Sequence, residues 1–118
     1  MKERSLSTKT YQVETIKKIL LPYLKKKPEV LKVILFGSLA RGEASRRSDI
    51  DLVFIIKSKK SFLKRYDDFM ELFALFPYAE LDFFLWTSEE LAKMKNRPFV
   101  RRLLQEGIVL YEQDQVTS

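Results

Sequence analysis

Two aspartates at alternate positions are the residues of this sequence best suited to chemistry. Asp49 and Asp51 begin the apolar run DIDLVFII. Because side chains two apart in an extended strand point to the same face, the two carboxylates would lie side by side. Like charges held close together repel each other and resist burial unless a cation or hydrogen bonds compensate. The pair therefore predicts a site for a divalent metal ion.

The sequence contains neither histidine nor cysteine, which narrows the chemistry of such a site. The absence of histidine excludes the usual general base at neutral pH and the commonest zinc ligand, and the absence of cysteine excludes disulfides and thiol nucleophiles. A metal ion bound by the aspartates would then be a hard cation with oxygen ligands, and Mg²⁺ is the obvious one.

A third carboxylate comes from the stretch AELDFFLW, which is predicted to be a strand over residues 79–86. Asp82 and Glu80 share one face of this strand, and Asp82 either joins the aspartate pair or faces water at a sheet edge. Three converging carboxylates can hold two Mg²⁺ ions, which bridge a nucleoside triphosphate and position an attacking hydroxyl for in-line displacement at the α-phosphate. Glu80 is the alternative third ligand.

The dipeptide Gly37-Ser38 ends the first apolar strand. It offers close backbone approach and a hydroxyl beside backbone N–H groups, which together make a small anion site, or it only turns the chain and caps a helix. A P-loop is excluded, because Glu43 and Ala44 follow Gly42 where that motif needs Lys and Ser or Thr.

The net charge of +6 and a pI near 9.5 invite a nucleic-acid interpretation, but the basic residues are dispersed along the chain. Most of them are best interpreted as solvated helix ends and loops. Arg46, Arg47 and Lys57 lie near the carboxylates in sequence, where they either attract a polyphosphate or are solvated. Of these, Arg47 is the candidate contact for the nucleotide.

Hydrophobic periodicity predicts a single α/β (α+β) domain over residues 1–118, with a frayed tail at about 113–118. The expected elements are a helix at 10–26, a strand at 30–36, a turn of helix from Ser38, a strand from Asp49 to Ile56, a helix at 61–76, the strand at 79–86, a helix opened by the capping box Thr87 to Glu90, a helix at 98–105 ended by Gly107, and an edge strand at 108–111.

Two helical segments carry more specific expectations. Pro22 should kink or interrupt the first helix one turn early. In the helix at 61–76, the aromatic residues at helical spacing, Phe62, Tyr66, Phe69 and Phe73, are predicted to face the core.

No apolar run has the length of a signal peptide or a membrane span. The sequence therefore predicts a cytoplasmic protein that does not associate with membranes.

The stretch FGSLARGEASRRSDIDLVF resembles the signature of the polymerase β-type nucleotidyltransferases: Gly-Ser, ten intervening residues, then Asp49-Ile50-Asp51. More closely it resembles the minimal nucleotidyltransferase (MNT) domains of bacteria and archaea. The resemblance implies the polymerase β-like nucleotidyltransferase fold, a mixed sheet flanked by helices. It also implies that Gly37 and Ser38 contact the triphosphate, that Asp49 and Asp51 bind both metals, and that Asp82 is the third carboxylate.

Similar MNT proteins are often paired with a HEPN-domain protein as antitoxin and toxin. The resemblance thus implies a protein adenylyltransferase that transfers AMP from ATP, with Mg²⁺, to a tyrosine hydroxyl of a partner HEPN toxin. Two alternatives remain. The protein could mask its partner without catalysis, using Phe83, Phe84 and Trp86 near a sheet edge, or it could modify a nucleic acid or a small molecule.

Overall fold

A four-stranded mixed sheet forms the centre of the computed structural model, which describes residues 11–43 and 49–113. The strand order is β3-β2-β1-β4, with β1 antiparallel to both β2 and β4, and β2 parallel to β3. The strands span Val30–Phe36 (β1), Asp49–Ile56 (β2), Glu80–Thr87 (β3) and Ile108–Glu112 (β4). The predicted strands are confirmed, with β4 at an edge.

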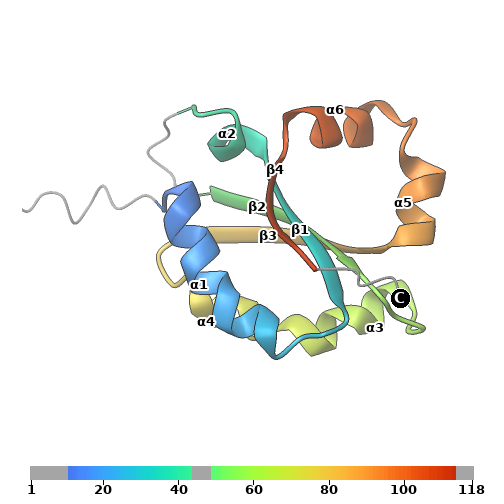
Figure 1. Cartoon of the computed structure of the whole chain (residues 1–118), viewed down its shortest axis with the longest axis horizontal. Helices are drawn as coiled ribbons and strands as arrows, with labels where there is room; N and C mark the ends of the chain where they lie inside the picture. Colours follow the sequence, from blue (N-terminus) through green and yellow to red (C-terminus); the bar gives the residue numbers. More distant parts are fainter. Residues whose placement is uncertain (1–10, 44–48, 114–118) are drawn as a thin grey trace, which may run out of the picture.

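Helices cover both faces of this sheet (Figure 1). Figure 1 shows α1, α3 and α4 on one face and α5 and α6 on the other, while α2 follows the end of β1 and lies beside α6. Their bounds are Val13–Lys25 (α1), Gly37–Ala40 (α2), Phe62–Arg65 (α3), Leu72–Leu75 (α4), Ser88–Met94 (α5) and Pro98–Glu106 (α6), and a 3₁₀ segment, η2, spans Tyr66–Phe69. The mixed sheet flanked by helices matches the predicted fold class.

Alternation along the strands creates two hydrophobic cores. On β2, Ile50, Leu52, Phe54 and Ile56 face the larger core, which lies on the side of α1. Val53 and Ile55 face the smaller core, which also contains Trp86 of β3 and Val100 and Leu103 of α6. On β2, even-numbered residues therefore face the larger core and odd-numbered residues face the smaller core, and on β3 the assignment is reversed.

The first helix has the predicted amphipathic pattern, with Ile16, Leu20 and Leu24 buried four residues apart. It does not stop one turn early, because it continues through Pro22 to Lys25. Pro22 is exposed, and so is Lys18, whose carbonyl group loses its hydrogen-bond donor, so water can serve that carbonyl and the cost is small.

The expected continuous helix at 61–76 is instead broken into α3, η2 and α4. The ammonium group of Lys27 donates a hydrogen bond to the backbone carbonyl of Asp68, which an unbroken helix would have given to the N–H of Leu72. A long-range contact thus competes with local helix propensity.

This break also changes the expected packing of the aromatic residues. Phe69 is buried as predicted, but Phe62 and Phe73 are 43% and 46% exposed. They lie against Tyr66 and Phe83 at the edge of the sheet rather than inside it. The aromatic spacing therefore identified the buried face only in part.

A buried arginine connects α3, β3 and α5. Arg65 donates hydrogen bonds to both carboxylate oxygens of Glu90, at 2.7 and 2.8 Å, and to the carbonyl of Leu85. Glu90 also completes the predicted capping box with Thr87 at the start of α5. One carboxylate thus caps a helix and pairs a buried cation.

The ion pair between Arg65 and Glu90 makes the stability of the protein depend on pH in the acid range. The hydrogen bond from Arg65, together with the Thr87 backbone, lowers the pKa of Glu90 from 4.5 to about 2. Because the folded pKa lies below the unfolded one, the stabilisation is present above about pH 4.5 and is lost as the pH falls through about 2. We expect Glu90→Gln to lower the free energy of unfolding at pH 7 by about 1 kcal/mol and to reduce its loss on acidification.

Urea unfolding at several pH values measures both effects. Glu89→Gln is the matched control, since Glu89 lies in the same first turn of α5 and neither caps the helix nor pairs with Arg65. Equal pH profiles for the two variants would contradict the assigned role of Glu90.

Within residues 11–43 and 49–113, the structure contains no helix that is both long enough and apolar enough to span a membrane.

Candidate active site

The three predicted carboxylates lie on one face of the sheet. Asp51 is the register partner of Asp82, and Asp49 is the partner of Glu80, across the parallel strands β2 and β3. By parity, Asp49 and Asp51 lie on the face of Val53, which is the side of α6. On β3, Asp82 has the parity of Trp86 and so shares that face. The sheet thus brings Asp82 beside the aspartate pair.

The end of β1 forms the next wall of the site. Phe36 pairs with Asp51 across the antiparallel strands β1 and β2, and Gly37 follows with a φ of +80°. A Cβ atom added to Gly37 would lie 2.3 Å from the Oδ2 atom of Asp51. Only glycine combines this backbone conformation with so close an approach. Ser38 follows as the second residue of the short helix α2.

The charges around Asp51 favour its protonated form. Burial raises its pKa first, and the carboxylates of Asp82 and Asp49 raise it further, while the nearby guanidinium of Arg41 lowers it. The Oδ1 atom of Asp49 is buried and has no hydrogen-bond partner within the described part of the chain. A positive ion between the two side chains would satisfy both groups.

The donor set therefore fits a hard divalent cation. Carboxylate oxygens are the ligands that Mg²⁺ prefers. A positive charge at this place would give the Asp49 oxygen a partner and would favour the ionised form of Asp51. Across residues 11–43 and 49–113, no three acidic side chains are already gathered closely enough to form a metal centre. Asp82 is exposed, so its side chain is free to turn towards a ligand.

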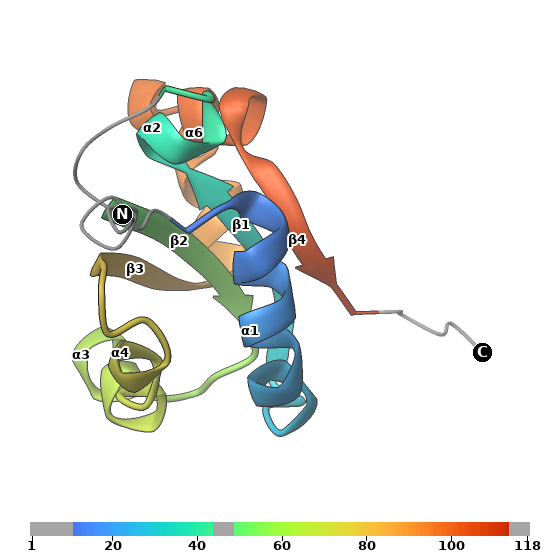
Figure 2. The same ribbon diagram turned by 90° about the vertical axis from the view of Figure 1, so that its left-hand side faces the viewer.

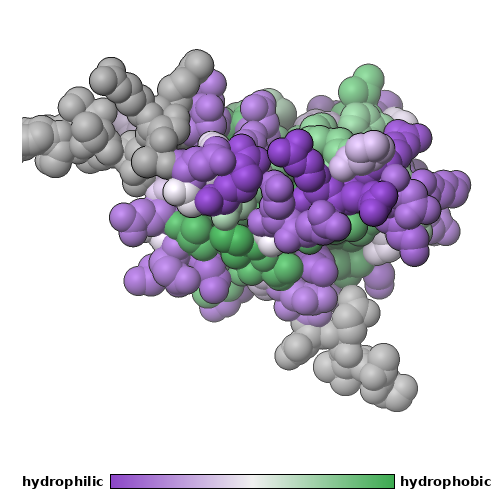
Figure 3. All heavy atoms as spheres, turned by 90° about the horizontal axis from the view of Figure 1, so that it is seen from above, coloured by the Kyte–Doolittle hydropathy of each residue, from purple (hydrophilic) through white to green (hydrophobic). Residues whose placement is uncertain are grey.

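A hollow of about 270 Å³ opens beside the carboxylates, between α2 and α6. Figure 2 shows these two helices side by side above the sheet, and Figure 3 shows mostly hydrophilic side chains across the middle of that side of the molecule. The residues that line the hollow are Phe36, Gly37, Arg41, Phe99, Arg102, Leu103 and Glu106. Gly37 connects the hollow to Asp51.

Sequence reasoning missed Arg41 as a residue of the site. It lies four residues after Gly37, which is one helical turn, and this spacing could have indicated that both residues belong to one wall. Its positive charge acts on Asp51, and it pairs with Glu43 through two hydrogen bonds of 3.1 and 3.2 Å.

The other predicted basic residues are not placed at the site. Arg47, the candidate nucleotide contact, and Arg46 lie outside the described residues, so both stay predictions. Lys57 follows the far end of β2, about 20 Å along the strand from Asp51. The closeness of Lys57 in sequence is therefore misleading.

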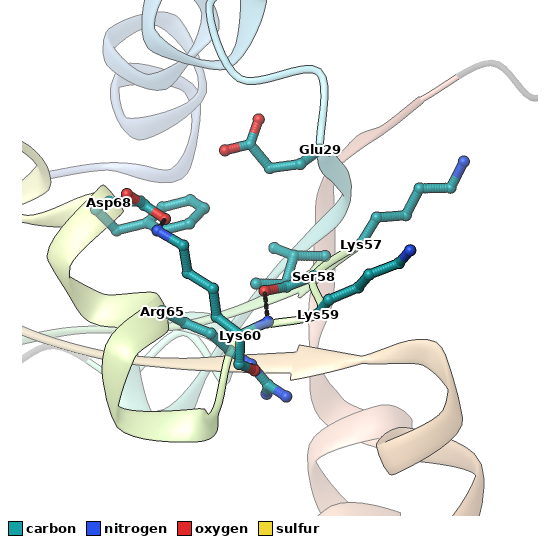
Figure 4. Close-up of a pocket in the computed structure, with 9 residues that line it drawn as sticks. Glu29, Lys57, Ser58, Lys59, Lys60, Arg65 and Asp68 are labelled. Atoms are coloured by element: carbon teal, nitrogen blue, oxygen red, sulfur yellow. Dashed lines mark hydrogen bonds and ion pairs between the residues drawn. The ribbon is translucent and has the colours of Figure 1, made fainter.

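A second hollow, of about 340 Å³, lies at that far end, near Lys57. Figure 4 shows Lys60 reaching across it to Asp68, with which it forms an ion pair of 2.6 Å, while Lys57 and Lys59 extend away. Glu29 adds a further negative charge to the lining. Lys60 and Asp68 thus neutralise each other inside this hollow.

The aromatic residues expected to serve a masking surface are mostly inside. Phe83 and Trp86 are each 7% exposed, and Phe84 stacks between Trp86 and Phe36 at ring distances of 5.2 and 6.1 Å. The premise that they form an exposed apolar edge is wrong, because each packs against one of the two cores.

Comparison with known proteins agrees with this geometry. The family model described as "Polymerase beta, Nucleotidyltransferase" matches residues 14–116. The chain is 32% identical over 86 residues to "Putative protein adenylyltransferase MJ1379" of Methanocaldococcus jannaschii, a match that covers 73% of this chain and 81% of the relative.

Solved structures share the fold. A crystal structure of a "putative nucleotidyltransferase" from Sulfolobus solfataricus has a TM-score of 0.57 at 21% identity, over 86% of this chain and 81% of that one. A crystal structure of a toxin-antitoxin with AMP-PNP has a TM-score of 0.57 at 19% identity, over 83% and 74%. With nearly its whole length matched by the family model, this chain belongs to the polymerase beta nucleotidyltransferase family and is a nucleotidyltransferase.

Proposed function

We propose that this protein transfers AMP from ATP to a tyrosine hydroxyl of a partner HEPN toxin, and so acts as its antitoxin in the cytoplasm. The observation that carries the proposal is Asp51 facing Asp82 across β2 and β3, with Gly37 pressed against it. It is supported by the relative named as a protein adenylyltransferase and by the similar fold of a toxin-antitoxin structure with AMP-PNP.

In this proposal Asp49, Asp51 and Asp82 hold two Mg²⁺ ions. When bound, Mg²⁺ neutralises charge that develops on the α-phosphate and on the departing pyrophosphate. Gly37 allows the nucleotide to approach the backbone, and Ser38 and Arg41 offer a hydroxyl and a positive charge to its phosphates. These residues bind and orient the nucleotide.

The acceptor would approach from the edge of the sheet. β3 is an edge strand, and Asp82 near its start is exposed. A hydroxyl carried by a large protein partner can therefore reach this position without entering a deep cavity. This accessibility favours a protein acceptor over a small molecule, which needs an enclosing pocket.

Mass spectrometry of the partner tests this proposal. The protein is incubated with ATP, Mg²⁺ and the proposed HEPN toxin partner, and we expect the toxin to gain one AMP on a tyrosine and to lose its activity. The toxin with that tyrosine replaced by phenylalanine should gain none. If the toxin is neutralised without gaining AMP, masking by contact replaces the proposal, and if only RNA or DNA gains AMP, the acceptor is a nucleic acid.

The third ligand can be identified by a matched pair of substitutions. Asp82→Asn should lower the rate of AMP transfer about 10²-fold, because Asp82 faces Asp51 in register and acts on its charge. Glu80→Gln should leave the rate within about twofold, because Glu80 lies opposite Asp49 in the strand register and does not raise the pKa of Asp51. Steady-state rates at saturating ATP measure both, and the reverse ranking would assign the role to Glu80.

A further inference from the structure

Two arginines from different elements meet at one carboxylate on the rim of the hollow between α2 and α6. Glu106 lies 3.6 Å from the guanidinium of Arg41 and 3.6 Å from that of Arg102. Both distances exceed the 2.7–2.9 Å typical of a charge-assisted hydrogen bond. Glu106 thus attracts both cations by charge, and among the described residues only Arg41 of the two has closer hydrogen bonds, which it donates to Glu43.

The ion pair of Arg102 with Glu106 differs from the buried pair of Arg65 with Glu90. Arg65 is 6% exposed and is bound to Glu90 at 2.7 Å, so it is committed to the structure. The side chain of Arg102 is 71% exposed, and an exposed ion pair of this kind contributes little to stability. Arg102 can therefore exchange its partner at small cost.

The packing of α6 fixes where Arg102 lies. Val100 and Leu103 are buried in the smaller core, which turns Arg102 towards the hollow. At the end of the helix, a Cβ atom on Gly107 would lie 2.5 Å from Ile34 of β1, so glycine lets α6 end directly against the sheet. At its start, Phe99 packs edge-on against Phe36. Both ends of the helix are thus fixed.

The hollow is suited to a polyphosphate. The guanidinium group of Arg102 can bind phosphate oxygens bidentately, and Arg41 adds positive charge from the opposite wall through the Nη1 atom that faces Glu106. A polyphosphate carries more negative charge than the single carboxylate between the two arginines. Gly37 belongs to both the hollow and the carboxylate site, so a chain of phosphates can extend from one into the other.

We propose that Arg102 binds the β- and γ-phosphates of the nucleotide, which take the place of Glu106 as the partner of its guanidinium group. This inference rests on the proposed nucleotidyl transfer, and it adds to the central motif a phosphate ligand that lies more than fifty residues after Asp49 in the chain.

Calorimetric binding of inorganic tripolyphosphate, ATP and AMP, at constant Mg²⁺ and ionic strength, tests it. Arg102→Gln should weaken binding of tripolyphosphate and ATP about tenfold and leave AMP unchanged, because AMP lacks the two outer phosphates. Arg101→Gln is the matched control, since it removes the same charge from an exposed position of α6 outside the hollow. It should change all three affinities by less than about twofold.

The outcomes separate this inference from the function on which it rests. If the wild type binds ATP but Arg102→Gln and Arg101→Gln behave alike, the role of Arg102 is wrong and nucleotidyl transfer stands. If Arg102→Gln weakens AMP as much as ATP, the contact is not with the outer phosphates, and the inference is also wrong. If the wild type binds no ATP, the proposed function fails and the inference fails with it.

Discussion

Asp51→Asn should lower AMP transfer about 10³-fold and at the same time raise the melting temperature of the metal-free protein at pH 7. The loss of activity follows from removing the carboxylate that faces both Asp49 and Asp82. The gain in stability follows from the raised pKa of Asp51, which burial and these two carboxylates cause. A substitution that stabilises the fold while it abolishes catalysis cannot be explained by unfolding.

The sign of this effect depends on pH. Because the folded pKa of Asp51 lies above the unfolded value of 3.8, its contribution to the free energy of unfolding declines as the pH rises from that value through the folded pKa. The Asn variant lacks this decline, so its advantage is present at pH 7 and vanishes in acid. Thermal unfolding with EDTA measures it.

A matched control removes an acid elsewhere. Asp67→Asn changes an exposed side chain of η2, on the opposite face of the sheet, and should leave the rate of transfer unchanged. Near-normal activity of Asp51→Asn, or a melting temperature below that of the wild type, would contradict the assigned site.

Gly37→Ala should lower AMP transfer about 10²-fold and destabilise the protein by about 2 kcal/mol. The φ of +80° is unfavourable for any side chain, and the new methyl group would collide with the Asp51 carboxylate, 2.3 Å away. The carboxylate has to move from its place, which misaligns the nucleotide.

Gly42→Ala separates these two causes. Gly42 has a similar φ of +75°, but a Cβ atom there would meet nothing within 4 Å. This variant should lose about 1 kcal/mol of stability and keep its rate of transfer. Urea unfolding and initial rates measure the pair, and equal losses of activity in both variants would show that backbone strain, and not contact with Asp51, explains the requirement for Gly37.

The sequence was sufficient to predict the strand that carries the aspartates, because local rules decide it. Alternation places Asp49 and Asp51 on one face, and the same rule applied to AELDFFLW places Asp82 there once the two strands pair in register. The capping box at Thr87 and the end of α6 at Gly107 are equally local features.

The parts that sequence could not supply depend on contacts between distant residues. The break after Phe69 needs Lys27, which lies 41 residues before Asp68, the residue whose carbonyl it contacts. Arg102 lines the hollow beside the carboxylates only because α6 packs over the same face of the sheet. The hydrophobic pattern within one segment does not indicate which distant segment will lie beside it. The single domain over residues 1–118 and the contact of Arg47 with nucleotide stay predictions.

The most direct test of the account is which phosphate of ATP leaves its label on the acceptor. The wild type is incubated with the toxin and with ATP labelled either on the α-phosphate or on the γ-phosphate, beside Asp49→Ala and Asp51→Ala. We predict stable transfer of the α-label only, and none by either variant. Transfer of the γ-label, or equal transfer by wild type and variants, would contradict nucleotidyl transfer at these carboxylates.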